Sequence, residues 1–350
     1  MRVKLSVKRV ALQLVHPWAI SRSAAATVEE VVVVELTAAD GTIGRGEAAP
    51  TARYKESAAS VEAFLAKVDA RGLSFNDVGG SMAYVETVAP HNHAAKCALD
   101  LALWDGAAKR AQKPVYDLLG LGFRDRHHLT SFTIGIAKPE MIRQKVLEAA
   151  AFPILKVKVG VADDRLNLAA VREVAPTKTL RVDANEGWKT REKALEMIEW
   201  LASDGHVEYI EQPMPATTTT KDWAWLKERS PLPIFGDESY HTAADIEQAA
   251  ESFHGINVKL VKTAGLTGGF AALKAARKAG LKTMIGCMIE TSILISAAGQ
   301  LAELCDHLDV DGSILTTNDP YAGLVIDRGI LSFAGAAEPY GLRVSPRPAS

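Results

Sequence analysis

The chain has 350 residues, of which 48% are hydrophobic and 23% are charged, and its formal net charge is −2 at pH 7. This length suits about two domains, or one large α/β unit with a smaller attachment, and the composition is ordinary for a globular enzyme. The near-zero charge excludes the strong positive field with which proteins bind nucleic acids or anionic membranes.

The cysteines and the N-terminal segment favour a cytoplasmic protein. Cys97, Cys287 and Cys305 are odd in number, far apart and without a Cys-x-x-Cys spacing, which indicates reduced, buried thiols and neither disulfides nor a zinc site. Residues 1–15 alternate charged and apolar side chains, as a strand does, and lack the continuous apolar core of a signal peptide. The chain has no apolar run of about 18 residues, so we expect no membrane span.

The N-terminal part is predicted to begin with antiparallel strands. Residues 3–15 and 29–50 have strand patterning, and Asp40-Gly41 inside the second segment is typical of a hairpin turn. Between them, residues 16–27 contain proline and small polar side chains, so we interpret this segment as a loop.

Helices are predicted next. Apolar residues at spacings of three and four predict helices over residues 55–68 and 93–111, the second of which ends before Pro114.

From about Ser131 onward, short apolar strands alternate with amphipathic helices. The expected strands are residues 131–135, 154–159, 180–183, 207–211, 232–237, 255–260, 281–286 and 307–311. Repeating strand–helix units imply parallel strands, and eight strands in roughly 180 residues close into a barrel more readily than they form an open sheet. The doubly wound alternative usually carries Gly-x-Gly-x-x-Gly after its first strand, and this chain has no such motif.

The strand within ILKVKVG, residues 154–160, carries two lysines on one face. Because strand side chains alternate, Lys156 and Lys158 point together while three apolar residues share the other face. Two ammonium groups about 7 Å apart repel each other unless water or carboxylates relieve the repulsion. An antiparallel strand with one wet face explains this stretch equally well, so the rest of the chain must decide.

Charged residues end the following strands at intervals of one strand–helix unit. Asp183, Glu211, Asp237 and Lys259 each end a strand, and they follow one another, counting from Lys158, at intervals of 22 to 28 residues. In a barrel these ends meet at one mouth. Buried carboxylates need counter-charge, and an oxygen-only set suits Mg²⁺ better than zinc. Helix N-capping explains one aspartate but explains three consecutive units poorly.

The two lysines that bracket the carboxylates indicate proton transfer. We expect Lys158 and Lys259 to flank the cation on opposite sides, where one base removes a proton and the other returns it on the opposite face, as in a racemase or epimerase. Mg²⁺ can stabilise the enediolate formed when the proton α to a carboxylate is removed. A free lysine, with a pKa of about 10.4, is a poor base, and Lys156 and the metal would help to lower that pKa.

The order and spacing of KVK, DANEGW, EQP, GDES and NVKLVKTAG resemble the enolase superfamily, in its muconate lactonizing enzyme subgroup. GRGEAAP and CALDLALWD are similar to its N-terminal part and first barrel helix, so the likeness covers nearly the whole chain. The resemblance implies an α/β fold, a modified TIM barrel (β/α)₇β with an N-terminal α+β capping domain. The cap would span residues 1–125 and the barrel 126–330, with a tail of about 330–350 packed back on the cap.

The resemblance also implies roles for individual residues. It implies one essential Mg²⁺ on Asp183, Glu211 and Asp237, the acid–base pair Lys158 and Lys259, the electrostatic helper Lys156, and Asn185 and Glu238 as neighbours of the metal ligands.

The eighth strand end distinguishes members of the subgroup, which includes cycloisomerases, o-succinylbenzoate synthases, N-succinylamino acid racemases and dipeptide epimerases. Asp309 and Asp311 in HLDVDG lie at i and i+2, so both face the mouth. Two anions suit a free α-ammonium, and the pair resembles the dipeptide epimerases. In the alternative, one aspartate caps a helix and the other is solvated. Glu290 in GCMIETS either lines the pocket or caps the next helix.

The sequence therefore predicts an isomerase that epimerises the C-terminal residue of an L,L-dipeptide by Mg-dependent two-base proton transfer. The alternatives are an o-succinylbenzoate synthase, an N-succinylamino acid racemase or a muconate cycloisomerase-type lyase on the same scaffold. A non-catalytic binding barrel is disfavoured because every lysine and carboxylate of the motif is present.

Substrate selection is expected to involve the capping-domain loops. Arg22, Arg53 and Lys55 can pair with an acidic side chain, although loop cations are mostly solvated, and Trp18 can favour an apolar one. The expected partner is this small molecule, with no nucleic acid and no membrane. We also expect a homo-oligomer, since apolar surface on such barrels often self-associates.

Overall fold

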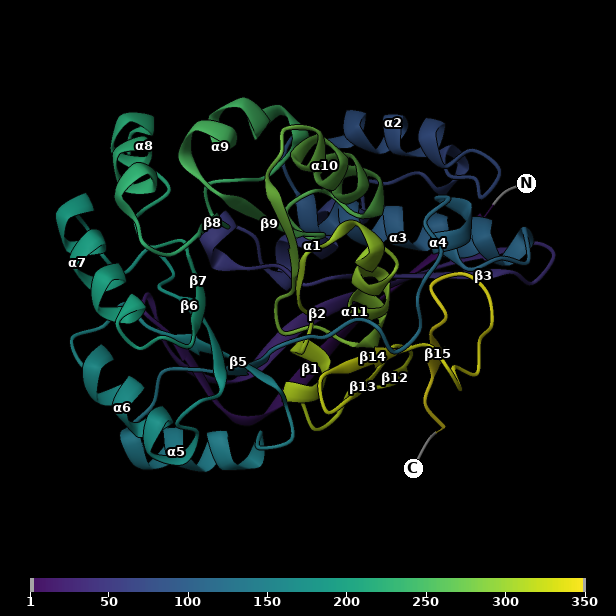
Figure 1. Cartoon of the computed structure of the whole chain (residues 1–350). Helices are drawn as coiled ribbons and strands as arrows, with labels where there is room; N and C mark the ends of the chain where they lie inside the picture. Colours follow the sequence, from purple (N-terminus) through teal and green to yellow (C-terminus); the bar gives the residue numbers. More distant parts are fainter. Residues whose placement is uncertain (1–2, 349–350) are drawn as a thin grey trace.

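The computed structural model describes residues 3–348, in which an N-terminal antiparallel sheet with its helices packs against a parallel barrel (Figure 1). Within that range, no helix is both long and apolar enough to cross a bilayer. The N-terminal sheet has the order β1-β2-β3. Its strands are β1 (Val3–Ile20), β2 (Ser23–Ala38) and β3 (Ile43–Ala48).

The predicted hairpin turn is confirmed, but the predicted loop over residues 16–27 is wrong. Gly41, at φ 85°, makes the turn between β2 and β3. β1 and β2 instead continue as a long ribbon that turns at Ser21 and Arg22. The pairing is irregular there, with register shifts on both sides of Trp18. Such irregular pairing tolerates Pro17, which has no N–H to donate, so local composition misled the prediction.

Strand β2 lies between two hydrophobic cores. Val31 and Val33 pack with the core that includes the barrel, whereas Val32, Val34 and Leu36 pack with the core of the capping helices. Because side chains alternate along a strand, one row faces each core. The run of valines in the sequence therefore reflects burial on both faces.

The capping helices follow the sheet. They are α1 (Ala58–Leu65), α2 (Val78–Val88), α3 (His93–Arg110) and α4 (Val115–Leu118). The two predicted helices are confirmed, although α1 is shorter than expected because the Ser57 hydroxyl accepts a hydrogen bond from Ser60 N and caps the helix there.

Eight parallel strands form the barrel, and seven α-helices connect them, which confirms the predicted modified TIM barrel (Figure 1). The strands are β4 (Phe132–Ile134), β5 (Ile154–Lys158), β6 (Thr179–Asp183), β7 (Val207–Glu211), β8 (Ile234–Gly236), β9 (Gly255–Lys259), β10 (Lys282–Gly286) and β11 (His307–Asp309). The helices are α5 (Pro139–Glu148), α6 (Asp164–Val174), α7 (Arg191–Ala202), α8 (Thr220–Arg229), α9 (Ile246–Ser252), α10 (Leu266–Lys278) and α11 (Ser292–Gly299). A parallel bridge from Thr130 to Leu308 links the two ends of the sheet.

The environment of β5 decides between the two interpretations of its lysines. β5 pairs in parallel with β4 and with β6, so the antiparallel strand with one wet face is excluded. Lys156 and Lys158 are 1% and 7% exposed and lie inside the barrel mouth. One layer below, Tyr209, Phe235 and Met284 pack together inside the barrel, with the buried Arg181 over the Tyr209 ring.

The C-terminal segment returns to the N-terminal part. It contains β12 (Tyr321–Ala322), β13 (Val325–Asp327), β14 (Ile330–Ser332) and β15 (Ser345–Pro346). Gly341 accepts a hydrogen bond from Val115 N and donates one to Lys113 O, and Leu342 N donates to Asp105. The domain boundaries at 125 and 330 stay predictions from the sequence.

Candidate active site

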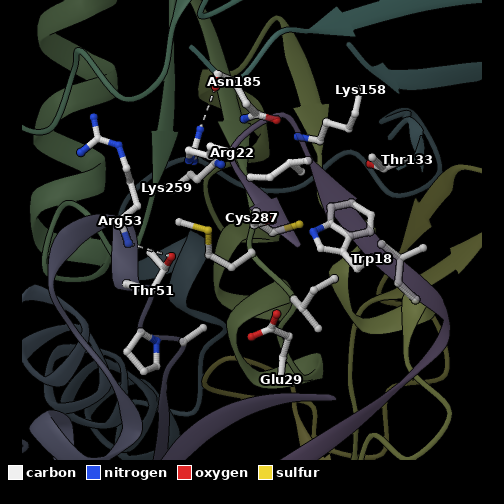
Figure 2. Close-up of a pocket in the computed structure, with 18 of the residues that line it drawn as sticks. Trp18, Arg22, Glu29, Thr51, Arg53, Thr133, Lys158, Asn185, Lys259 and Cys287 are labelled. Atoms are coloured by element: carbon white, nitrogen blue, oxygen red, sulfur yellow. Dashed lines mark hydrogen bonds between the residues drawn. The ribbon is translucent and has the colours of Figure 1, made fainter. Parts of the chain in front are cut away.

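A cavity of about 510 Å³ lies where the barrel strands end and the capping domain covers them (Figure 2). The barrel contributes Thr133, Lys156, Lys158, Asn185, Lys259, Cys287, Met288, Ile289, Asp309, Asp311 and Leu315. From the capping domain, Trp18, Ile20, Arg22, Glu29, Arg53 and Tyr54 are among the lining residues. The turn of the β1–β2 ribbon is held on the barrel because Ser21 Oγ donates to Asn185 O at 2.8 Å.

Gly160 makes the close approach of this turn possible. It ends the ILKVKVG segment at φ 100°, a conformation that favours glycine. A Cβ at this position would lie 2.4 Å from Ala184 O and 3.0 Å from the Ser21 side chain. The residue that follows the lysine strand is therefore part of the contact between cap and barrel.

Lys158 and Lys259 face each other across the barrel. They end β5 and β9, and three strands, β6, β7 and β8, lie between these two in the sheet order. In a ring of eight strands, two strands four steps apart are diametrically opposed. Both lysines line the same cavity, so two amines reach it from opposite sides.

Lys156 lies among the carboxylates. Its Nζ is 2.7 Å from Glu211 Oε2, 2.7 Å from Asp309 Oδ2 and 3.3 Å from Asp183 Oδ2. Burial opposes the charge of this ammonium, but these carboxylates outweigh burial and raise the pKa of Lys156 well above its usual value. These contacts favour the charged form of Lys156, which suits an electrostatic role better than that of a base.

The other two lysine–carboxylate contacts join neighbouring strands. Lys158 donates to Asp183 Oδ2 at 2.6 Å, and Lys259 Nζ lies 3.0 Å from Asp237 Oδ2. Burial would raise the pKa of Asp183, but Lys158 and Lys156 outweigh it and lower that pKa to about 2. Burial likewise opposes the charge of Lys259, while Asp237 raises its pKa above the usual range. For Lys259, the neighbouring Asp237 therefore acts against the lowering of the pKa that the sequence predicts for the metal-bound site.

Glu211 is only partly compensated by the neighbouring lysine. Burial and the repulsion from Asp183 raise the pKa of Glu211 to about 7, despite the nearby Lys156. In the described part of the chain, Glu211 Oε2 and Asp237 Oδ2 are buried and accept no well-aligned hydrogen bond, and their contacts are the ion pairs with Lys156 at 2.7 Å and Lys259 at 3.0 Å. A buried oxygen of this kind is well suited to bind a cation.

The residues at this position fit a hard divalent ion in their chemistry. Asp183, Glu211 and Asp237 offer only oxygen ligands from three successive strands, as Mg²⁺ prefers. Among residues 3–348, however, no three acidic, imidazole or thiol groups already converge into a metal cage. The Lys156 ammonium lies between two of the carboxylates, so the metal role of these residues stays a prediction.

Asn185 and Glu238 lie next to the carboxylates, and their role as neighbours of metal ligands stays a prediction. Asn185 N donates to Asp183 Oδ1 at 2.8 Å, and Asn185 Nδ2 lies 3.4 Å from Glu238 Oε1. Asn185 and Glu186 both have positive φ values, 43° and 67°, which is unusual for residues other than glycine. This strained turn is held from the capping side, because Arg22 Nη1 donates to Asn185 O at 3.2 Å.

The two arginines of the capping loops already have carboxylate partners. Arg22 Nη1 lies 2.5 Å from Glu238 Oε1, and Arg53 donates to both oxygens of Glu186 at 2.7 and 2.8 Å. Their side chains are 30% and 32% exposed. The structure therefore gives both residues a contact with the barrel that the sequence did not reveal.

Asp309 and Asp311 both line the cavity but differ in their partners. Asp309 accepts from Lys156 and from Ser131 Oγ, and these contacts outweigh burial and lower its pKa. Asp311 accepts from Thr133 N at 2.6 Å and has no cationic partner within residues 3–348. Burial and the neighbouring Asp309 raise the pKa of Asp311 to about 7.

Glu290 lies outside the cavity lining. Its carboxylate turns back to accept from Met288 N at 2.9 Å, while Thr291 caps α11 by accepting from Ile293 N. Glu47 of β3 also binds this helix start, since Thr291 N donates to its carboxylate at 2.8 Å. The structure therefore shows neither of the two predicted roles of Glu290, because the residue neither lines the cavity nor caps α11.

Lys262 and Asn257 support the site and were missed in the sequence. Lys262 is buried and donates to Asp237 Oδ1 at 2.6 Å and to the backbone oxygens of Asp237 and Tyr240. Asn257 donates to Glu211 Oε1 at 2.7 Å. Asn257 precedes Lys259 by two, so alternation along β9 could have revealed it, whereas Lys262 follows the strand in a turn without periodicity.

The fold and the site together define a barrel enzyme whose lysine–carboxylate centre is covered by a capping domain. Residues 2–120 match the family described as mandelate racemase / muconate lactonizing enzyme, N-terminal domain, and residues 140–325 match the family described as enolase C-terminal domain-like. The chain therefore belongs to the enolase superfamily, in its mandelate racemase and muconate lactonizing enzyme family.

Similar proteins share a type of reaction. The chain is 62% identical to an L-Ala-D/L-amino acid epimerase of Pedosphaera parvula, over 95% of this chain and 96% of that protein. The substrate-liganded L-Ala-D/L-Glu epimerase of Bacillus subtilis has a TM-score of 0.91 and 26% identity, and each chain is fully covered. A dipeptide epimerase of Cytophaga hutchinsonii, complexed with Mg and D-Ala-L-Val, has a TM-score of 0.89 and 27% identity over 99% of this chain and 96% of that chain. The chain is accordingly an isomerase, an epimerase that acts on amino acid derivatives.

Proposed function

We propose that this protein epimerises the C-terminal residue of dipeptides, using Lys158 and Lys259 as the two bases. One observation carries the proposal: the two lysines end diametrically opposed strands and line one cavity. A stereocentre between them could lose its proton to one amine and regain a proton from the other, which inverts its configuration.

The α-ammonium of the dipeptide would bind at the end of β11. Asp311 has no cationic partner among the described residues, whereas Asp309 is bound by Lys156. A free ammonium would supply the missing charge and hydrogen-bond donors. An N-acylated amino acid lacks this group, which favours a dipeptide over the acyl substrates. The relatives named above are likewise dipeptide or L-Ala-D/L-amino acid epimerases.

Mg²⁺ is the metal that we propose for this site, on Asp183, Glu211 and Asp237. Bound there, it would supply positive charge opposite the negative charge that develops on the substrate carboxylate and would compete with Lys259 for Asp237. The oxygen-only donor set, the high pKa of Glu211 and the buried oxygens without hydrogen bonds support this proposal.

Other residues of the chain compensate charge, orient the carboxylates and cover the site. Lys156 stays charged and compensates Asp309 and Glu211 from below the substrate position. Lys262 and Asn257 hold one oxygen each of Asp237 and Glu211 and so orient these carboxylates. The ribbon turn at Ser21 and the capping loops cover the mouth of the cavity.

Solvent deuterium tests the proposal. L,L-dipeptides incubated with Mg²⁺ in D₂O are expected to take up one deuterium at the α-carbon of the C-terminal residue as the L,D-epimer forms, measured by mass spectrometry and NMR. Lys158→Ala and Lys259→Ala should each lose epimerisation, and each should retain exchange from only one of the two epimers. Lys282→Ala is the control, because this lysine lies at the opposite end of a barrel strand and is 64% exposed.

Two outcomes would contradict the proposal. Normal exchange of both epimers by Lys158→Ala would show that this lysine is not a base. Label that enters only N-acylated amino acids would move the assignment to the acylamino acid racemases. The cytoplasmic location and the homo-oligomeric state stay predictions from the sequence.

A further inference from the structure

One carboxylate on the capping side of the cavity has no role in the reaction described above. Glu29 of β2 lies two residues before Val31 and four before Val33, the row that packs toward the barrel. Alternation along the strand therefore points Glu29 to the barrel, and the residue lines the cavity. Figure 2 shows its carboxylate on the other side of Cys287 from Asn185 and Lys158.

Glu29 is the charged group of this side that lacks a counter-charge. Within residues 3–348, no hydrogen bond or ion pair joins its side chain to another residue. The residue is half-buried, and burial raises the pKa of its carboxyl. A carboxylate in this setting is stabilised by a cation that enters the cavity.

The cations of the same side are already neutralised. Arg22 is bound to Glu238, and Arg53 makes a two-point contact with Glu186. An acidic substrate side chain would therefore have to displace one of these carboxylates to gain a partner, and it would approach Glu29 as a like charge. The two arginines that the sequence predicted as partners of an acidic substrate side chain are thus already paired with carboxylates of the barrel.

Several side chains of the cavity lining are apolar. Trp18, Ile20, Ile289 and Leu315 line the cavity together with Met288. Such a surface suits an aliphatic stem, and Glu29 suits a positive group at the end of that stem, as in lysine or arginine side chains.

We propose that Glu29 is a specificity-determining residue that makes this enzyme prefer dipeptides with a cationic side chain over dipeptides with an acidic one. The inference rests on the proposed dipeptide epimerisation and adds the charge class of the substrate. Dipeptides with an uncharged apolar side chain should fall between the two classes, since they gain the apolar contacts but not the ion pair.

The experiment compares kcat/KM for dipeptides of alanine with lysine, leucine or glutamate, with the variable residue at either position. For at least one position the wild-type enzyme should prefer lysine to glutamate by about tenfold or more. Glu29→Gln should lower the ratio of the two kcat/KM values by about tenfold, because the amide removes both the attraction and the repulsion. This ratio is insensitive to a general loss of active enzyme.

Glu35→Gln provides the matched control. Glu35 lies on the same face of β2 and is also half-buried, but it lies away from the cavity. Arg45 Nε donates to its carboxylate at 2.9 Å. This variant should leave the ratio unchanged. A wild-type preference for glutamate, or a Glu29→Gln enzyme with the wild-type ratio, would overturn the inference. Absence of deuterium exchange in every dipeptide, including those with leucine, would instead overturn the proposed function.

Discussion

The two sides of the cavity hold charge in different ways. On the barrel side, lysines and carboxylates that are at most 7% exposed contact one another at 2.6 to 3.3 Å and are fixed by parallel strands. On the capping side, Arg22 lies in the turn of the β1–β2 ribbon and Arg53 in a short 3₁₀ helix after β3, and both side chains are about one-third exposed. We therefore expect proton transfer to depend on the rigid barrel side. Substrate selection should depend on the capping side, whose charges solvent can screen.

The difference also predicts unequal costs of mutation. Removing one member of a buried charge network leaves another charge without a partner in a low-dielectric environment, which costs several kcal/mol. Removing one member of a partly exposed pair leaves a charge that water can solvate.

Metal removal should have the largest effect and should act through the barrel side. Treatment with a chelator is expected to lower deuterium exchange at the α-carbon by at least about a thousandfold. The site then lacks the positive charge of the metal, which stabilises the transition state. Mg²⁺ should restore the activity and raise the midpoint of thermal unfolding, since it relieves the repulsion at Glu211. Full exchange in metal-free protein would remove the basis for assigning Asp183, Glu211 and Asp237 as metal ligands.

Lys262→Met tests whether the buried network supports the fold as well as the metal. The variant leaves Asp237 without its buried donor, so the free energy of unfolding should fall by about 3–5 kcal/mol, measured by chemical denaturation. Calorimetry should show weaker Mg²⁺ binding. Lys282→Met, at an exposed lysine, should change the free energy of unfolding by less than about 0.5 kcal/mol. Equal costs for the two variants would contradict the contrast between buried and exposed charges.

The pH dependence of KM should follow the ionisation of the Asp311 carboxyl. Burial and Asp309 raise its pKa from 3.8 to about 7, so the carboxyl is mostly neutral below that pH and mostly ionised above it. Binding of the dipeptide ammonium should therefore weaken as pH falls, and KM should rise by about tenfold from pH 8 to pH 6. Asp311→Asn should raise KM at pH 8 and flatten this limb of the profile. If the KM of the Asp311→Asn variant still rose steeply at low pH, protonation of Asp311 would not be the cause of that rise.

Arg53→Ala should have the smallest effect. Its partner Glu186 keeps a hydrogen bond from Ala216 N and lies 3.7 Å from Arg22 Nη1, so the free energy of unfolding should fall by less than about 1 kcal/mol. We expect kcat/KM to fall by only a few-fold, measured with the same dipeptides. A loss above about 2 kcal/mol would show that the capping side is held as firmly as the barrel side, and the comparison would then need revision.

Much of the barrel side was predictable from local sequence. Strand–helix alternation and the polar residue at each strand end depend on short-range periodicity, which is why Asp183, Glu211 and Asp237 were found on successive strands. The lysine pair of β5 needed only the alternation of side chains along one strand. These features are local, so no knowledge of distant contacts was required.

The tertiary structure decided the rest. Pairing between β1 and β2 made an irregular ribbon of the predicted loop at residues 16–27, since cross-strand hydrogen bonds override local composition. Lys262 reached Asp237 only through the turn after β9, and Arg22 and Arg53 met Glu238 and Glu186 only when the cap packed on the barrel. The sequence by itself determined which charges the barrel strands carry, because strand geometry repeats every two residues. The partners of those charges, and those of the capping loops, depended on the path of the whole chain, because each partner comes from a distant element.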